Sequence, residues 1–447
     1  MKVDRGERDY YYLRQKVTIS TIMISRRKWL THSLATVVGT ALLAPTELKA
    51  LQDRESHLAQ QLGAEVKDEV YWELVKSQFV LEEGLRYFNN GSLGTCPEYV
   101  VKATEQFRRT LDGFPSKYMW GGWADHKEEV REKVSEMLGV SAETIALIHN
   151  TTEGMNLIAS SLDLAEGEEI LLSDHEHTSA RIPWKHWQER KGVKLKTVYL
   201  PLLPQSVEEV VDLFRQAITP KTKVISLVHV TNTNGMRLPV KEISEMAHER
   251  GILVAVDGAQ SMGMFEINLA QLGCDFYTSS SHKWIFSPKG MGVFYATEEA
   301  QQLLSPLVVC RGYDDRSIRR LENYNTRNLP ELLGLGAALD FRNLIGGQRI
   351  EERTFELKAY FREQFKGDNR FAIKTPELDA LSAGIQTVEV VGKDVKEVKK
   401  MLAEQYQIDC RPMSSHDLNG LRISLAIFTT KADVDYLVGA LREIAEG

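Results

Sequence analysis

The sequence predicts an α/β protein with a mostly parallel β-sheet that is covered by helices on both faces. In its central part, short continuous apolar runs alternate with segments of helical character, such as 206–217 and 240–250. Continuous apolar runs are typical of strands buried on both faces, and their alternation with helices is typical of parallel sheets. Seven such runs predict a seven-stranded sheet, and they lie at 145–148, 170–172, 195–200, 224–230, 252–256, 276–278 and 292–295.

Composition and charge are those of an ordinary globular protein. The 447 residues are 43% hydrophobic and 26% charged, which allows two or three domains and a sizeable core. A net charge of −7 argues against a general nucleic-acid-binding protein. The cysteines lie far apart without a C-x-x-C pair, so neither a zinc site nor a dense disulfide framework is expected, while a disulfide stays open for an exported protein. They are Cys96, Cys274, Cys310 and Cys410.

Residues 1–50 have the layout of an export signal. Arg26 and Arg27 precede a weakly apolar run at 34–44, and small residues follow that run. The adjacent arginines resemble a twin-arginine signal, which predicts a periplasmic or exported protein that crosses the membrane through the twin-arginine export machinery. The alternatives are a cytoplasmic protein whose basic leader is no signal, and translation that begins at Met23.

The remainder of the chain divides into three predicted parts. Residues 51–86 predict an N-terminal helical segment, because apolar positions are interspersed among charged residues there. Residues 87–339 predict a large domain around the sheet, and residues 340–447 a smaller C-terminal α+β domain that closes over a substrate. The smaller domain is predicted from helices at 349–366, 393–405 and 431–445 and from strand-like runs at 385–391 and 421–427.

Two glycine-containing segments come before the sheet. Residues 87–94 predict a short strand that ends in a turn, because Asn-Gly and Gly-Thr pairs mark tight backbone. Residues 118–123 are rich in aromatic residues and glycine. This second segment is either a packed surface loop or a wall of the substrate pocket, and the sequence leaves both interpretations open.

The residues that follow the predicted strands carry the functional signal, because ligands of parallel sheets bind at the carboxyl ends of the strands. Asp257 closes the run at 252–256, and Lys283 follows the run at 276–278. A lysine can form a Schiff base with the aldehyde of pyridoxal phosphate (PLP), and an acid can pair with its protonated pyridine nitrogen. Alone, the lysine would be a surface residue and the acid a helix cap. Together they predict a PLP site.

A phosphate site is predicted beside this pair. Thr151 and Thr152 open a helix after the first run, and hydroxyls with backbone amides at a helix N-terminus bind anions, although a threonine there can equally be a simple cap. Ser280 and His282 flank the lysine and add phosphate donors.

Two further strand ends carry polar residues. His175 and His177 follow the second run, but the sequence offers no third metal ligand, so a histidine stacked on the cofactor ring is expected here and a metal site is not. Asn232 follows the fourth run and is placed to donate to the ring hydroxyl.

Through these residues, the segment 85–445 resembles the class V aminotransferase group of fold-type-I PLP enzymes. That group includes cysteine desulfurases, selenocysteine lyases and isopenicillin N epimerase. The motifs at 89–94 and 150–156 look most like the epimerase branch. The resemblance implies the PLP-dependent transferase fold of type I for the predicted sheet.

The resemblance also implies roles for individual residues. Arg422 would grip the substrate carboxylate with a bidentate fork, although it could also be an ordinary strand arginine, and Asn90 would join it at the substrate. Thr326 would reach the phosphate of the neighbouring subunit, which implies a homodimer with shared active sites, although the family usually has glycine where Asn325 stands. The remaining implied roles are the Schiff base for Lys283, the ring nitrogen for Asp257, ring stacking for His177, the ring hydroxyl for Asn232 and Gln260, and the phosphate for Thr151, Thr152, Ser280 and His282.

The predicted function is that of a PLP-dependent enzyme that acts on an amino acid through an external aldimine, by transamination or epimerisation. Lys283, Asp257 and His177 are its predicted catalytic residues. One alternative is a carbon–sulfur lyase or desulfurase-like enzyme, and another is a non-catalytic PLP-binding protein. Desulfurases carry their nucleophilic cysteine on a loop shortly before the carboxylate-binding arginine, whereas Cys410 directly precedes Arg411 here, which disfavours persulfide chemistry.

Overall fold

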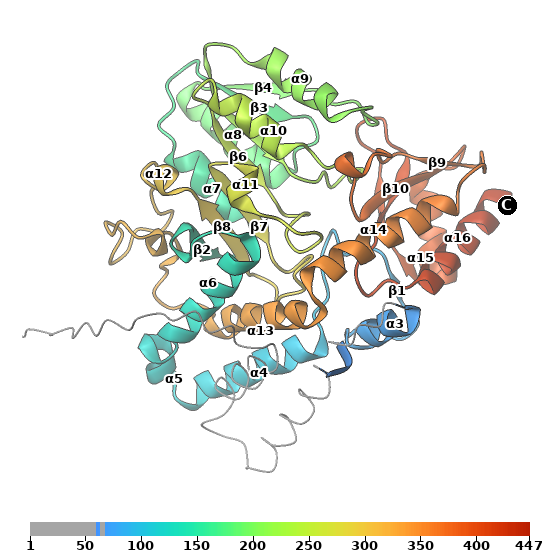
Figure 1. Cartoon of the computed structure of the whole chain (residues 1–447), viewed down its shortest axis with the longest axis horizontal. Helices are drawn as coiled ribbons and strands as arrows, with labels where there is room; N and C mark the ends of the chain where they lie inside the picture. Colours follow the sequence, from blue (N-terminus) through green and yellow to red (C-terminus); the bar gives the residue numbers. More distant parts are fainter. Residues whose placement is uncertain (1–59, 63–67) are drawn as a thin grey trace, which may run out of the picture. The chain divides into compact units, whose positions relative to one another are not determined.

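Two β-sheets organise the computed structural model, which describes residues 60–62 and 68–447 (Figure 1). The predicted leader at 1–50 and most of the predicted helical segment before residue 68 lie outside the described residues. The described part of that segment contains helix α3 (Glu69–Ser77), which Asp68 caps by accepting from the backbone N–H of Tyr71. None of the helices in the described ranges combines the length and the apolar character that a membrane span requires.

The larger sheet confirms the predicted mostly parallel, seven-stranded architecture. Its strand order is β2-β8-β7-β6-β5-β3-β4. Only β8 runs antiparallel to its neighbours β2 and β7, and every other pairing is parallel. Each predicted apolar run overlaps one strand, and the strands are β2 (Ile145–Ile148), β3 (Glu169–Ser173), β4 (Lys194–Val198), β5 (Thr222–Val228), β6 (Leu253–Asp257), β7 (Phe276–Ser280) and β8 (Gly292–Ala296).

Both faces of this sheet are buried except at the edge strand β4, which is partly exposed, and this burial is why the other strands are largely apolar. One set of alternating side chains, including Ile148, Val224 and Phe276, packs with residues of α7 (Thr151–Ser161) and α8 (Thr178–Lys191) in one core. The other set is buried as well, and it includes Leu147, Ile225, Val254, Tyr277 and Val293.

Further helices surround this core. Helix α13 lies beside α4 and α6 (Figure 1). The bounds are α4 (Glu98–Gly113), α5 (Pro115–Lys117), α6 (Ala124–Leu138), α9 (Val207–Ala217), α10 (Val240–His248), α11 (Leu269–Leu272), α12 (Glu298–Gln301) and α13 (Leu329–Ile345), with single 3-10 turns at Ala142–Thr144, Ile318–Glu322 and Asp379–Leu381.

The aromatic segment after α5 forms a π-helical turn, Tyr118–Gly122. Trp123 is buried against Phe107, with ring centroids 6.0 Å apart, whereas Trp120 is exposed. No contact in the described part of the chain joins these rings to the surroundings of Lys283, so within one chain the surface-loop interpretation fits.

The smaller C-terminal sheet is antiparallel and follows the predicted α+β pattern. Its strand order is β12-β13-β10-β9. A separate parallel pair joins β1 (Arg86–Tyr87) to β11 (Ile408–Asp409). The predicted boundary after residue 339 falls inside α13, and the predicted domain ranges themselves stay predictions. The elements are α14 (Gly347–Glu363), β9 (Phe371–Ile373), β10 (Ile385–Val390), α15 (Val395–Tyr406), β12 (Arg411–Met413), β13 (Gly420–Ser424) and α16 (Lys431–Glu446).

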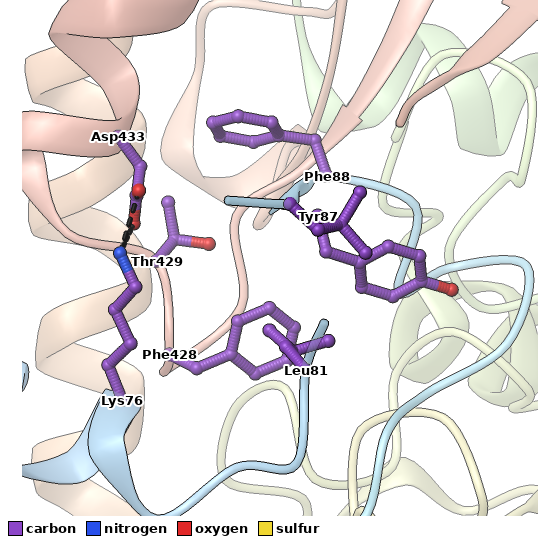
Figure 2. A pocket seen from close by; sticks show the side chains of 8 residues that line it. Lys76, Leu81, Tyr87, Phe88, Phe428, Thr429 and Asp433 are labelled. Atoms are coloured by element: carbon purple, nitrogen blue, oxygen red, sulfur yellow. Dashed lines mark hydrogen bonds and ion pairs between the residues drawn. The ribbon is translucent and has the colours of Figure 1, made fainter. Parts of the chain in front are cut away.

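A small cavity lies where the segment after α3 meets the C-terminal sheet and its helices (Figure 2). Lys76 and Asp433 form an ion pair of 2.7 Å at its side, and Asp433 also caps α16 through Thr430. Asp433 pairs in addition with Arg86 at 2.9 Å. These bonds fix the start of the described chain on the C-terminal domain, next to the 89–94 loop. The cavity is lined by Lys76, Leu81, Leu85, Tyr87, Phe88, Phe428, Thr429 and Asp433.

Candidate active site

The structure brings most of the predicted site residues to one edge of the large sheet. Asp257 is the last residue of β6, and Ser280 is the last residue of β7. Lys283 follows in the turn after β7, while Asn232 follows β5 and His177 follows β3. Strands β7, β6, β5 and β3 are consecutive neighbours in the sheet, so their carboxyl ends meet.

The amine of Lys283 lies in a desolvated setting, although the residue as a whole is half-buried. Desolvation is the main cause that lowers its pKa to about 8, the charges of Arg422 and Arg411 act in the same direction, and Asp257 opposes them. In the described chain the amine forms neither an ion pair nor a hydrogen bond. Protonating a buried amine that has no ion-pair partner costs free energy, because the charge is poorly solvated. The site therefore favours the neutral, nucleophilic form of the amine.

The 89–94 loop packs directly on the lysine turn. Asn90 donates from Nδ2 to the carbonyl of Lys283 at 3.2 Å. A Cβ at Gly94 would lie 2.2 Å from the carbonyl oxygen of His282 and 2.5 Å from that of Lys283, so only glycine allows this approach. The loop therefore fixes the backbone that carries the amine.

Asp257 is a buried acid that forms no ion pair among the described residues. Its Oδ1 accepts a hydrogen bond from the backbone N–H of Ala259 at 2.9 Å. Burial raises its pKa, and the charges of Lys283 and His177 oppose that effect. No salt bridge to Asp257 occurs within residues 60–62 and 68–447. A protonated ring nitrogen would supply the missing positive charge.

The N-terminus of α7 and the end of β7 meet at the predicted phosphate site. Ser280 Oγ accepts from the backbone N–H of Thr151 at 3.0 Å and lies 2.9 Å from Thr151 Oγ1. Thr152 is exposed at the same helix end. Nδ1 of His282 is buried and finds no partner among the described residues. Burial, Lys283 and Lys289 lower the His282 pKa to about 4, so the ring is neutral near pH 7.

Arg422 is a buried guanidinium on β13 that no carboxylate neutralises in the described chain. It donates from Nη1 to the carbonyl of Asn232 at 3.1 Å, and from Nη2 to Asn89 Oδ1 at 3.1 Å and to Ser92 Oγ at 2.6 Å. Its Nε is buried without a partner in the described ranges, as is Oδ1 of Asn90. Burial foremost lowers the Arg422 pKa to about 9. Such a group binds a carboxylate strongly.

Two predicted cofactor contacts have other partners in the structure. The Gln260 amide donates to the carbonyl of Gly91 at 2.7 Å and accepts from Trp284 Nε1 at 3.0 Å. These two hydrogen bonds hold the 89–94 loop against the turn that carries Lys283. Asn232 is half-buried, and its backbone carbonyl accepts a hydrogen bond from Arg422. A ring-hydroxyl role for either residue stays a prediction.

His177 and Thr326 lie at the margins of the site. His177 caps α8, with Nδ1 at 2.6 Å from Ser179 Oγ, and its ring is exposed and open to a partner. Thr326 is exposed, and no contact in the described chain joins it to Lys283. Asn325 before it adopts φ 58°, in the left-handed region where asparagine substitutes for glycine.

Two residues at this edge were not assigned roles from the sequence. Glu176 Oε1 accepts from Ser173 Oγ at 2.7 Å and from the backbone N–H of Val228 at 3.0 Å. Burial raises the Glu176 pKa to about 8, which keeps the group largely protonated near pH 7. His175 is bound by Thr233 and stacks on His416, and the described residues contain no cluster of three metal-binding side chains.

Comparison with known proteins gives one family. The family model for class-V aminotransferases matches residues 86–437. The isopenicillin N epimerase of Amycolatopsis lactamdurans is 32% identical over 394 residues, which cover 84% of this chain and 99% of that protein. A probable cysteine desulfurase of Halalkalibacterium halodurans is 30% identical over 393 residues, covering 83% of this chain and 96% of that protein.

The solved structures agree with this result. The cysteine desulfurase CsdA of Escherichia coli superimposes with a TM-score of 0.72 at 26% identity, covering 85% of this chain and 99% of that chain. The likeness confirms the predicted PLP-dependent transferase fold of type I.

Proposed function

Because the chain belongs to the class V aminotransferase family, whose members are PLP-dependent enzymes, we propose that it catalyses epimerisation or transamination of an amino acid at Lys283. The observation that carries the proposal is an amine, a carboxyl group and a guanidinium that are desolvated near one sheet edge, none of which has an ion-pair partner within the described chain. A cofactor and a substrate would supply the missing partners: an aldehyde for the amine, a protonated ring nitrogen for the carboxyl group and a carboxylate for the guanidinium.

The residues fit PLP on three points. The hydroxyls of Ser280 and of the exposed Thr152, with His282 Nδ1, which has no partner among the described residues, would form a donor set for a phosphate at the N-terminus of α7. Asp257 would hold the protonated ring nitrogen. Lys283 would hold the aldehyde carbon. When bound, PLP supplies an electron sink for the charge that develops at the substrate α-carbon.

The chain's own residues perform the proton chemistry. The Lys283 amine, with a pKa of about 8, has a substantial neutral fraction near neutral pH and can accept the α-proton. Arg422 orients the substrate by its carboxylate, since Nε is unused and Nη2 is held by two neutral oxygens that a carboxylate can replace. Asp257 keeps the ring nitrogen protonated during the transfer.

Desulfurase-like chemistry is the second candidate, since desulfurases are among the relatives. The burial of Cys410 argues against it. This cysteine is 1% exposed within the core of the C-terminal domain, and burial raises its thiol pKa to about 12. The 414–419 loop, which precedes Arg422, contains Ser415 and His416 but no cysteine. A persulfide on Cys410 would require this core to open.

The test is to incubate the purified, PLP-loaded protein with a panel of L- and D-amino acids. Epimerisation gives the opposite enantiomer and incorporates solvent deuterium at the α-carbon without a keto acid. Transamination gives a keto acid and pyridoxamine phosphate, whereas a lyase gives pyruvate and ammonia or sulfide. The Lys283→Ala variant is the control, and it should lose the visible cofactor band and all turnover. Equal turnover by this variant would refute the proposal.

We further propose that residues 1–50 direct the folded enzyme into the twin-arginine export route, on the strength of Arg26 and Arg27 before an apolar run. A fusion of residues 1–50 to a reporter should be exported, and replacing both arginines with lysine should retain the reporter in the cytoplasm. Equal export of the fusion with both arginines replaced would contradict the twin-arginine proposal. A second fusion that begins at Met23 tests whether translation starts there.

A further inference from the structure

The hairpin formed by β12 and β13 carries Arg411 and Arg422, the two arginines whose charges lower the pKa of Lys283. Arg411 pairs with Arg422 across the hairpin, and Met413 pairs with Gly420 next to the 414–419 loop. At the tip of this loop, His416 and Asp417 adopt φ values of 59° and 57°. Histidine and aspartate adopt this left-handed region more readily than most residues other than glycine, but at a cost, so tertiary contacts help to hold the loop in place.

His416 supplies those contacts. Its Nε2 donates to the carbonyl of Asp174 at 2.8 Å, and its Nδ1 lies 3.0 Å from Ser415 Oγ. Its ring stacks on that of His175, with centroids 4.5 Å apart and an interplanar angle of 17°. Asp174 and His175 directly follow β3 of the large sheet, so this contact joins the hairpin loop to the sheet edge that carries Asp257.

His175, on which His416 stacks, is connected to Arg422 through the segment 232–233. His175 is 1% exposed, and its Nδ1 lies 2.6 Å from Thr233 Oγ1. The carbonyl of Thr233 accepts from Thr387 Oγ1 on β10 at 3.0 Å, and the preceding carbonyl, of Asn232, accepts from Arg422. The hairpin is thus fixed to the large domain at its tip by the histidine pair and at its middle by the arginine.

We propose that His416, stacked on His175, is a positioning residue that fixes the β12–β13 hairpin so that Arg422 is set for the substrate carboxylate. This inference rests on the proposed function and adds to it the element that orders the carboxylate site. His416 acts through the hairpin, since its hydrogen bonds and ring contact in the described chain are with Ser415, Asp174 and His175. Its loss therefore weakens substrate binding and spares cofactor binding.

The test compares PLP-loaded His416→Ala, His416→Gly and His416→Gln with the wild type. The probe is the panel amino acid that the wild type turns over fastest. Alanine and glycine should raise KM about tenfold while kcat changes less than about twofold. The reason is that the carboxylate contact stabilises the bound substrate and the transition state equally, so its loss weakens binding alone. Glutamine retains an N–H donor for the Asp174 carbonyl and should recover much of the KM. The visible cofactor band and the PLP affinity should be unchanged in all three.

The glycine variant separates contact from backbone strain, since glycine adopts φ 59° freely. A KM increase in the alanine variant alone would assign the effect to strain and overturn the proposal. Amide hydrogen exchange over 411–424 is measured in parallel with PLP bound. It should rise in the alanine and glycine variants, and unchanged exchange would overturn the proposal even if the wild type turned over no amino acid. Absence of turnover of every amino acid by the wild type would refute the proposed function, independently of the exchange result.

Discussion

The charge state of Lys283 is set by its surroundings. Its amine has a pKa of about 8 because desolvation foremost, and the charges of Arg422 and Arg411, lower the pKa more than the charge of Asp257 raises it. An exposed lysine titrates near 10.4. The site therefore provides a neutral amine at a pH where an ordinary lysine is almost fully protonated.

This shift predicts the pH dependence of cofactor loading. Only the neutral amine attacks the aldehyde, so the rate constant for attachment of PLP to the cofactor-free protein should rise about tenfold per pH unit below pH 8 and level off above it. Removing a neighbouring cation in Arg422→Met should move the midpoint upward. Removing the anion in Asp257→Asn should move it downward.

The measurement is the growth of the visible cofactor band after mixing, between pH 6 and pH 10. The same series with Nα-acetyl-lysine, corrected for the titration of its own amine, gives the dependence that belongs to PLP itself, and this dependence is divided out. A wild-type midpoint near that of the free lysine would contradict the desolvated site.

Single residues differ in how far the sequence predicts them. Lys283 and Asp257 could be placed because each closes an apolar strand, and neighbouring parallel strands bring their ends together. Glu176 bonds the backbone N–H of Val228, and His416 bonds the carbonyl of Asp174 across 242 positions. Contacts of that kind leave no periodic pattern, so the protonated acid and the histidine pair emerge only from the structure.

At the scale of elements, the 89–94 loop and the lysine turn form one unit. Gln260 bonds both Gly91 and Trp284, and Asn90 bonds the carbonyl of Lys283. The amine is therefore positioned by a loop that lies about 190 residues earlier in the chain. A substitution in the 89–94 loop should therefore displace the backbone at Lys283 without altering the lysine side chain itself.

The substitution Gly94→Ala tests this coupling. The new methyl group would lie 2.2 Å from a backbone carbonyl oxygen, which cannot move as a side chain can. We expect a loss of about 1–3 kcal/mol in the free energy of unfolding, and weaker PLP binding, because overpacking displaces the lysine turn.

A matched control exists in the same chain. Gly439 lies within α16, and a methyl group there meets nothing within 4 Å, so Gly439→Ala should stabilise the protein by up to about 1 kcal/mol through helix propensity. Chemical denaturation with and without PLP gives both effects. A neutral Gly94→Ala with unchanged PLP affinity would show that the loop does not position the lysine.

Elements were predictable where burial leaves a pattern. Each of the seven strands of the large sheet overlaps an apolar run, and all but the edge strand β4 are mostly buried. The antiparallel direction of β8 was not predictable, since a buried strand has the same pattern in either direction. The parallel pairing of β1 with β11 joins two strands of two residues each, which are too short for any periodicity.

At the scale of the whole molecule, two features fit a second copy of the chain beside the first. Thr326 is exposed on a turn that Asn325 holds in the left-handed region. The segment between α12 and η3 (Ile318–Glu322) also exposes several large apolar side chains close together in sequence, which favours a surface that a partner covers. They are Leu303, Leu307, Val308, Val309 and Tyr313. The predicted homodimer with shared sites is proposed on these grounds.

Mixed dimers test the shared site. Thr326→Val should weaken PLP binding if its hydroxyl serves the neighbour's phosphate, and Lys283→Ala should abolish covalent attachment in its own chain. In a dimer of one chain of each kind, the site with the intact lysine would also receive the intact threonine, whereas the other site would have neither. Unfolding and refolding an equal mixture should therefore give half hybrid dimers, each with one wild-type site.

The readout is the PLP dissociation constant of the chains that retain Lys283. Two affinity classes should appear in the mixture, one equal to the wild type and one equal to the Thr326→Val homodimer. Light scattering should give about twice the 50.7 kDa mass of one chain. A single weak class would mean that Thr326 serves the site of its own chain, because then no exchange of partners could restore it.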